Sequence, residues 1–259
     1  MNHTSNVHSI ASQLNESHLL SELPQSLNPS LPFILGETNS LYNEGAPGLS
    51  NSFGAALWGI DFNLYCAANN IQRTHFHQGT NYRYQAWQPL TTNVTVKGTK
   101  PPFYGSLTTA AFLGNLTVPS LRPQIANIPL PNVREAAYAA YLNDTLSRVI
   151  IINLQEYNSS NNYTDPYPRP VFDHKIDVPS GCKGHAEVQR LMADGSDALS
   201  GITFDGYSYN YELDDGNPVL LHNVTRGETI KVNGQGKASV KVPASSAVIV
   251  RFACEEGCR

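Results

Sequence analysis

One glutamate near the start of the chain directly follows a short apolar run. The run Leu31–Leu35 ends at Gly36, and its length and composition are typical of a fully buried strand. Glu37 comes next, and in parallel α/β folds the reacting groups project from the C-terminal ends of the strands. A carboxylate placed there can attack an anomeric carbon, provided that a second carboxylic acid protonates the leaving oxygen. The simpler alternative is a solvated loop glutamate.

Other side chains nearby could also take part in chemistry. His75 and His77 alternate on a predicted strand and face one side, but no third zinc ligand is evident, so we expect no metal site. Either histidine could instead line a sugar site. Glu44, on the loop that follows the first strand, is expected to be solvated. Trp58 is expected in a helix core, whereas Trp87 stays open between a core position and a platform for a sugar ring.

These candidates need a scaffold, and residues 1–120 predict alternating helices and strands. Apolar residues recur at helical spacing near the N-terminus and over 53–68. A third helical stretch, 103–113, follows a Pro-Pro pair that suits a helix start. A second strand is expected over 71–76. This alternation implies βαβ units with a parallel sheet.

Residues 121–259 have a different character. Short segments in this half are rich in β-branched residues or alternate polar with apolar ones, and turn signals separate them: 147–153, 171–178, 237–242 and 247–252. They predict an antiparallel β-sandwich. The Pro-rich stretch 119–131 is the natural boundary, so we expect two domains, 1–120 and 121–259.

Composition limits the classes of function. The chain has 259 residues, of which 41% are hydrophobic and 15% charged, and its formal net charge is −4. A core can therefore form, and there is no basic footprint for nucleic acid. No apolar run approaches the roughly 18 residues that a membrane helix needs. We expect neither a nucleic-acid nor a membrane partner, and the sequence does not indicate the oligomeric state.

Asparagine sequons indicate the compartment. Asn-x-Ser/Thr motifs occur at Asn2, Asn15, Asn93, Asn115, Asn143, Asn158, Asn162 and Asn223. They predict a secreted protein glycosylated at the last six of these positions, although chance in an Asn- and Ser-rich chain is the alternative. The first residues have no positive start and no continuous apolar stretch, as a signal peptide would. We therefore expect that the true N-terminus is missing.

The four cysteines fit an oxidising compartment. Their spacing matches no zinc pattern, because no Cys-x-x-Cys is present. Cys254 and Cys258 lie in a short polar tail, and a disulfide from one of them to Cys182 is expected. Cys66 lies in a predicted apolar helix and is expected to be a buried free thiol.

The segment around the glutamate resembles a known enzyme family. Gly-Glu-Thr-Asn-Ser-Leu-Tyr-Asn-Glu-Gly-Ala-Pro (36–47) and Leu-Ser-Asn-Ser-Phe-Gly-Ala-Ala-Leu-Trp (49–58) resemble the nucleophile segment and following helix of family 79 glycoside hydrolases, the β-glucuronidase and heparanase family. The tail 250–254 is similar to the last sandwich strand of that family. The resemblance covers nearly the whole chain and is strongest over 30–115. It implies the C-terminal part of a (β/α)8 TIM barrel followed by a β-sandwich, and hydrolysis of β-glucuronides with retention.

The resemblance also assigns roles to residues of two loops. Glu37 takes the role of nucleophile. The residues that would bind the substrate are Tyr42, Gly79, Thr80, Asn81 and Tyr82. Tyr42 would line the sugar pocket, while the Tyr82 hydroxyl and nearby backbone amides would hold the uronate carboxylate, which several neutral donors can do. Thr80 departs from the glycine of heparanase-like members, at a position where close backbone approach matters.

The resemblance finally implies that half of the active site lies outside this chain. A whole barrel takes about 250 residues, and the first residues resemble the helix before the seventh strand, so the general acid/base glutamate would be absent. We expect a truncated, secreted hydrolase of uronic-acid-containing carbohydrate that is inactive alone. It would need no cofactor, because carboxylates and water suffice. The alternative is a non-catalytic carbohydrate-binding or structural β-sandwich module.

Overall fold

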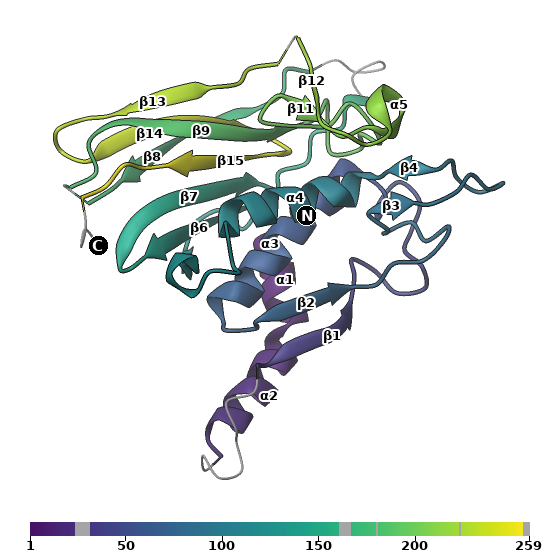
Figure 1. Cartoon of the computed structure of the whole chain (residues 1–259), viewed down its shortest axis with the longest axis horizontal. Helices are drawn as coiled ribbons and strands as arrows, with labels where there is room; N and C mark the ends of the chain where they lie inside the picture. Colours follow the sequence, from purple (N-terminus) through teal and green to yellow (C-terminus); the bar gives the residue numbers. More distant parts are fainter. Residues whose placement is uncertain (24–31, 161–166, 180, 223, 256–259) are drawn as a thin grey trace.

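A computed structural model describes residues 1–23, 32–160, 167–179, 181–222 and 224–255. Helices α3 and α4 lie between a small parallel sheet, β1–β2, and a large antiparallel sheet (Figure 1). A further strand pair covers the opposite face of the large sheet.

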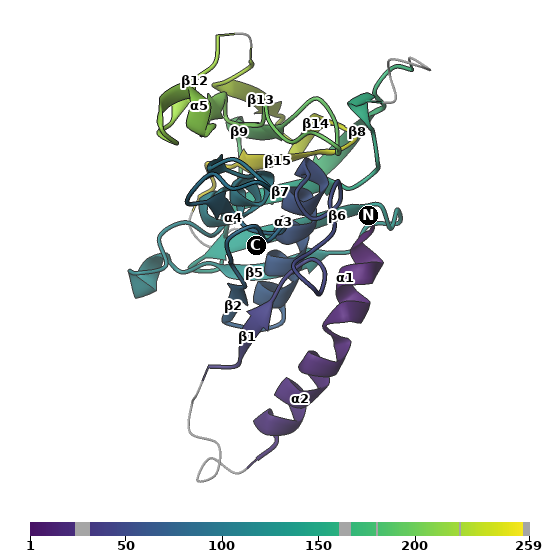
Figure 2. The same ribbon diagram turned by 90° about the vertical axis from the view of Figure 1, so that its right-hand side faces the viewer.

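Two helices open the chain and run down one side of the molecule (Figure 2). α1 (His3–Ser9) is capped by Asn2, whose side-chain oxygen accepts a hydrogen bond from the Ser5 amide at 2.7 Å. α2 (Ala11–Ser21) follows and has no buried residue. The helix predicted near the N-terminus is confirmed.

The next segment contains a βαβ unit, as predicted. Its elements are β1 (Ile34–Thr38), α3 (Phe53–Ala68), β2 (Arg73–Phe76), β3 (Trp87–Gln88), β4 (Gly98–Thr99) and α4 (Pro101–Leu113). β1 and β2 pair in parallel. The prediction that the first strand ends at Leu35 is wrong: after a register shift Thr38 still pairs with Phe76. Glu37 therefore belongs to the strand instead of following it.

A nine-stranded antiparallel sheet forms most of the second half. The spatial order is β12-β11-β10-β9-β15-β7-β6-β5, and β13 also pairs with β9. The bounds are β5 (Gln124–Ile128), β6 (Glu135–Leu142), β7 (Thr145–Asn153), β9 (Gly184–Met192), β10 (Thr203–Phe204), β11 (Tyr207–Ser208), β12 (Val219–Leu220), β13 (Glu228–Val232) and β15 (Ser246–Arg251). Of two short helices, η1 (Pro119–Leu121) lies between α4 and β5, and α5 (Tyr211–Asp214) connects β11 to β12.

Both faces of the sheet are buried along most of β6, β7 and β15, where successive residues point to opposite sides. Tyr138 of β6 and Ile249 of β15 belong to the cluster that includes Leu57 of α3. Their neighbours Ala137 and Val248 belong to a second cluster on the other face. The helices of the first half and the sheet of the second half therefore share one hydrophobic core.

The second cluster lies between the large sheet and the antiparallel pair β8 (Val171–Asp177) and β14 (Lys237–Pro243). β14 alternates exposed and buried residues along its length, as a strand with one solvated face should. The predicted antiparallel β-sandwich is confirmed.

The cysteines divide as expected into a pair and a free thiol. A disulfide joins Cys182 to Cys254, one of the two pairings expected, and Cys258 lies outside the described residues. Cys66 is free and buried in α3, and burial raises the pKa of its thiol to about 12. Within the described part of the chain, no helix has the length and apolar character needed to cross a membrane.

Candidate active site

Glu37 lies near the C-terminal end of β1, beside the C-terminal end of β2. The backbone N–H of His77 donates to the Thr38 carbonyl at 2.9 Å, and Asn39 Nδ2 donates to the His77 carbonyl at 2.9 Å. These bonds fix the exit of both strands and bring His77 Nδ1 to 3.9 Å from Glu37 Oε1. The Glu37 side chain is 77% exposed, so its carboxylate is open to a ligand.

A row of aromatic rings continues from the imidazole. The ring centroids of His77 and Tyr82 lie 5.3 Å apart, and those of Tyr82 and Tyr84 lie 5.7 Å apart, edge to face. Gly79 makes room for this row, because a Cβ there would lie 2.6 Å from carbons of the Tyr82 ring. Burial raises the pKa of the Tyr84 hydroxyl, and the charges of Tyr82 and Glu37 raise it further. Tyr84 therefore stays a hydrogen-bond donor at neutral pH.

The loop expected to bind a uronate is held by its own polar groups. Asn81 adopts a left-handed conformation with φ of 71°. Its backbone N–H, one of the expected donors, donates to Gln88 Oε1 at 3.0 Å. Its side-chain oxygen accepts from Thr92 Oγ1 at 2.5 Å. Asn81 therefore maintains the shape of the loop. Thr80 is exposed and Tyr82 is half-buried, so these two remain available to a ligand.

The other candidates are spread around this centre. Tyr42 is 85% exposed on the loop after β1, and Glu44 on the same loop is exposed. His75 is exposed on β2, and Trp87 is 56% exposed. Trp58 packs against phenylalanines of α3 and β2, which confirms its place in the core. No group of three or more potential metal ligands occurs in the described ranges.

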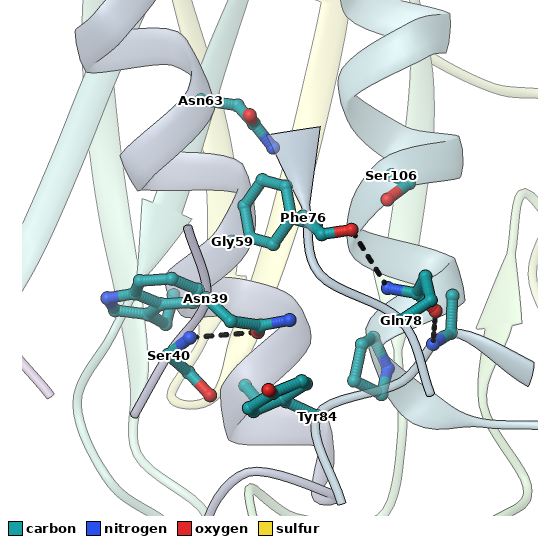
Figure 3. Close-up of a pocket in the computed structure, with 12 residues that line it drawn as sticks. Asn39, Ser40, Gly59, Asn63, Phe76, Gln78, Tyr84 and Ser106 are labelled. Atoms are coloured by element: carbon teal, nitrogen blue, oxygen red, sulfur yellow. Dashed lines mark hydrogen bonds between the residues drawn. The ribbon is translucent and has the colours of Figure 1, made fainter. Parts of the chain in front are cut away.

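A small hollow with a mixed polar and apolar lining lies next to these loops, between α3, α4 and the strand ends (Figure 3). Gln78 crosses it: its Nε2 donates to the Phe76 carbonyl at 3.4 Å and its Oε1 accepts from the Ala86 amide at 2.7 Å. The cavity of about 20 Å³ has room for about one water molecule and is too small for a sugar ring. The sequence did not predict that Asn39, Gln78 and Tyr84 lie at the site. For Asn39 and Gln78, their positions just after the ends of two strands could have indicated it.

Comparisons with known proteins decide the family. The profile of the Glycosyl hydrolase family 79 C-terminal beta domain matches residues 137–249. A β-glucuronidase of Aspergillus niger is 54% identical over 257 residues, which cover 96% of this chain and 46% of that protein. A β-glucuronidase of Neurospora crassa is 45% identical and is matched over 85% of this chain and 45% of its own length. The chain belongs to glycoside hydrolase family 79.

This family 79 chain spans about half the length of the relatives that it matches. A solved 4-O-α-L-rhamnosyl-β-D-glucuronidase from Fusarium oxysporum shares its fold, with a TM-score of 0.75 at 24% identity over 97% of this chain and 49% of that one. A GH51 arabinofuranosidase from Xanthomonas axonopodis gives 0.53 at 14% identity over 98% and 48%. About half of each of these two larger glycosidases therefore has the same helix-covered β-sandwich fold as this chain.

Proposed function

We propose that this chain is the C-terminal half of a retaining β-glucuronidase and that Glu37 is its catalytic nucleophile. The observation that carries the proposal is an exposed carboxylate at the C-terminal end of a parallel strand, 3.9 Å from an imidazole. The 54% identity to a β-glucuronidase supports the reaction type.

The reaction needs two carboxyl groups with different tasks. Glu37 attacks C1 of the uronate, and the bond from C1 to the leaving oxygen breaks as a second carboxylic acid gives that oxygen its proton. Water then hydrolyses the glycosyl ester, with the second group acting as base. We place this second group, about 5 to 5.5 Å from the nucleophile in a retaining enzyme, on barrel strands that precede this chain. The chemistry requires no cofactor.

His77 acts as a positioning residue for the nucleophile. Its ring lies against the Tyr82 ring, and its backbone donates to the Thr38 carbonyl and accepts from the Asn39 side-chain amide. The imidazole Nδ1 lies 3.9 Å from Glu37 Oε1, close enough for the two groups to interact. It also biases the direction in which the exposed Glu37 side chain points.

The substrate is a carbohydrate that contains uronic acid. The Tyr82 hydroxyl and Thr80 hold its carboxylate, with Tyr42 at the rim of the site; Gly79 and Asn81 give the loop its shape. Neutral donors can hold a carboxylate when several converge on it.

We propose that residues 1–120 complete a (β/α)8 barrel and that 121–259 form the β-sandwich domain. The support is the parallel pair β1–β2, whose outer edges have no strand partner in the described part of the chain. Exposed strand edges are normally covered, and earlier barrel strands would cover these.

We also propose that the protein is secreted and glycosylated. The disulfide suits an oxidising compartment. The sequon asparagines Asn93, Asn115 and Asn143 are exposed. Asn158 is half-buried and its side-chain amide donates to Glu156. Asn162 and Asn223 lie outside the described residues.

A chimera tests the nucleophile. This chain replaces the matching C-terminal portion of the A. niger β-glucuronidase, and turnover of 4-nitrophenyl β-glucuronide is measured. Glu37→Gln should lower turnover by at least about 10³-fold, because loss of a covalent nucleophile costs several orders of magnitude. Glu44→Gln on the same loop is the matched control and should stay near the parent chimera. Azide should restore turnover to Glu37→Ala and yield the α-configured glycosyl azide.

Two results would contradict the proposal. Near-parental turnover by the Glu37→Gln chimera would remove Glu37 from the reaction. Robust turnover by the 259-residue chain alone would show that no second half is needed. A chimera that folds but is inactive with the native Glu37 would favour the alternative, a non-catalytic carbohydrate-binding or structural module.

A further inference from the structure

A groove of about 460 Å³ lies at the tip of the β6–β7 hairpin. Leu142 and Thr145 pair across this tip, and the two residues between them, Asn143 and Asp144, have φ angles of 48° and 63°. Two left-handed residues in a two-residue loop form a tight type I′ turn, which asparagine and aspartate tolerate. Asn143 and Asp144 are both exposed, so the turn projects into solvent.

The groove borders the core of the sandwich. Its wall includes Asn143 and Leu146 of the hairpin, and Phe252 and Cys254 of the segment after β15. The Phe252 backbone N–H donates to the Ser147 carbonyl at 2.9 Å, which holds the two segments side by side (Figure 1). Leu146 is buried in the second hydrophobic cluster, and Phe252 and Cys254 pack on that cluster. The groove therefore exposes an edge of this cluster.

The groove also gives access to the disulfide. Cys182 is fully buried, whereas Cys254 is partly exposed and lines the groove. A thiolate that reduces the bridge must reach one of the two sulfurs, and the rate of exchange depends on that access. The groove is thus a path by which an external thiol can reach Cys254.

We propose that the groove binds the first sugars of an N-linked glycan carried by Asn143. Asn143 begins the sequon Asn-Asp-Thr and is itself part of the groove wall, so the glycan starts inside the groove. The volume is that of a small-ligand site. The inference rests on the proposed secretion and glycosylation, and it does not depend on the proposed nucleophile.

The wall of the groove has the chemistry that a sugar needs. A pyranose ring has an apolar face of C–H groups, which suits contact with the Phe252 ring. Its hydroxyls can accept a hydrogen bond from the Ser147 hydroxyl, whose oxygen accepts from Arg148 Nη1 at 3.2 Å. A glycan seated there covers Phe252 and the path to Cys254.

The modification is a group transfer from a lipid-linked oligosaccharide pyrophosphate. Asn143 Nδ2 attacks C1 of the first N-acetylglucosamine, and a bond from nitrogen to C1 forms. The bond from C1 to the pyrophosphate oxygen breaks, and the leaving pyrophosphate keeps the electron pair. A base takes the proton that Nδ2 loses. The exposed turn presents Asn143 to the transferase.

Secretion of the 259-residue chain from a fungal host tests the inference. Peptide mass spectrometry should show that Asn143 carries a glycan. Dithiothreitol should reduce the Cys182–Cys254 bridge at least about tenfold more slowly in the glycosylated chain than after complete enzymatic removal of the glycans, because access limits thiol exchange. Trimming each glycan to its first sugar should keep most of this protection.

Three variants, each measured before and after glycan removal, separate the glycan from the groove. Asn143→Asp removes the attachment but tolerates the left-handed turn, so the two rates should become equal. Phe252→Leu keeps the glycan but removes the ring, and the protection should fall to about threefold or less. Asn115→Asp is the matched control and should keep full protection. Asn115 is an exposed sequon residue outside the groove, and its side-chain oxygen accepts from Thr117, as an aspartate can.

The contrary outcomes are distinct. An unmodified Asn143 in a chain that carries glycans at other sequons would overturn the inference and leave the proposed secretion intact. An occupied Asn143 with equal reduction rates before and after glycan removal would place the glycan outside the groove. Protection that persists in Asn143→Asp would assign the effect to other glycans and would also overturn it. A secreted chain without any glycan would contradict the proposed glycosylation as well, but not the role of Glu37.

Discussion

Two carboxylates of the first half have opposite environments. Asp61 of α3 is fully buried and accepts hydrogen bonds from the Asn6 amide at 2.7 Å and the Tyr138 hydroxyl at 2.6 Å, with His3 Nδ1 2.9 Å away. Every strong contact of Asp61 is thus made within the protein. Glu37 has one imidazole neighbour and is otherwise open to solvent. A buried charge that stabilises the fold is paired with other groups of the protein. A carboxylate that is proposed to react with a substrate is instead exposed and not enclosed by such partners.

The contact between His3 and Asp61 predicts a dependence of stability on pH. The hydrogen bond to Asp61 raises the pKa of His3, outweighing the opposing effect of burial. A raised pKa contributes stability that is fully present below the unfolded value of about 6.5 and is lost as pH rises through the higher folded value. The free energy of unfolding should therefore fall above about pH 6.5, as measured by urea denaturation across pH 5 to 9.

The control uses a second histidine on the same helix. His3→Gln should remove this part of the pH dependence, because glutamine can donate to Asp61 but does not titrate. His8→Gln should leave it unchanged, because His8 is exposed. An identical pH dependence in the protein and its His3→Gln variant would show that the Asp61 contact does not carry the effect.

At the level of elements, the C-terminal end of α4 is held by two arginines of neighbouring strands. Arg148 of β7 donates to the Phe112 carbonyl and, at 2.9 Å, to that of Leu113. Arg251 of β15 donates to the Ala111 carbonyl at 2.8 Å. Burial, followed by the charge of Arg251, lowers the pKa of Arg148 to about 10. The final carbonyls of the helix, which have no partner within it, are thus satisfied by the sheet.

Arg148→Met should therefore destabilise the protein. Methionine keeps the apolar stem but leaves the helix carbonyls without donors, which costs about 1.5 to 3 kcal/mol for bonds to a charged group. Urea unfolding measures the loss. Arg134→Met, at an exposed position, should change stability by less than about 0.5 kcal/mol. Equal urea-unfolding midpoints for Arg148→Met and Arg134→Met would mean that the contacts of Arg148 do not anchor α4.

The elements also show what could be predicted from the sequence. Helices over 53–68 and 101–113 follow from apolar spacing and the Pro-Pro start, which are local signals. β6 was not predicted, because its four alanines favour a helix and have low strand propensity. It is a strand, paired with β5 and β7, because its small side chains leave room for α3 on one face and for β-sandwich residues on the other.

The candidate site could be predicted only in part. The end of a short strand places Glu37, and the family resemblance names the loop at 79–82. The bond from the Asn81 amide to Gln88 and the neighbourhood of His77 depend on how two loops fold against each other. Nothing in the linear spacing of these residues specifies such contacts.

At the scale of the whole molecule, the disulfide ties the end of the chain to the sandwich core. Cys182 is fully buried within the second hydrophobic cluster, and Cys254 packs on that cluster. The bridge closes a loop with a sequence separation of 72, which corresponds to about 4 kcal/mol in the chain-entropy model. Replacing both cysteines with alanine should lower the free energy of unfolding by a similar amount, and dithiothreitol should bring the unmodified protein to the same midpoint. If neither the alanine replacements nor dithiothreitol changed the denaturation midpoint, the disulfide would not have this role.

The shared core predicts unequal stability across the first half. Leu57 and Ile60 of α3 are fully buried against the large sheet, so their amides should exchange hydrogen only through global unfolding. β1 and β2 pair only with each other among the described strands, and Ile34 is 41% exposed. A two-stranded sheet is marginal by itself, so amides of 34–38 and 73–76 should exchange at least about 10² times faster than those of α3. In the chimera with the A. niger N-terminal portion, the same amides should become protected while those of α3 change little. Full protection of β1 and β2 in the monomeric 259-residue chain would show that their edges need no neighbouring strands, and the proposed barrel would lose its main structural support.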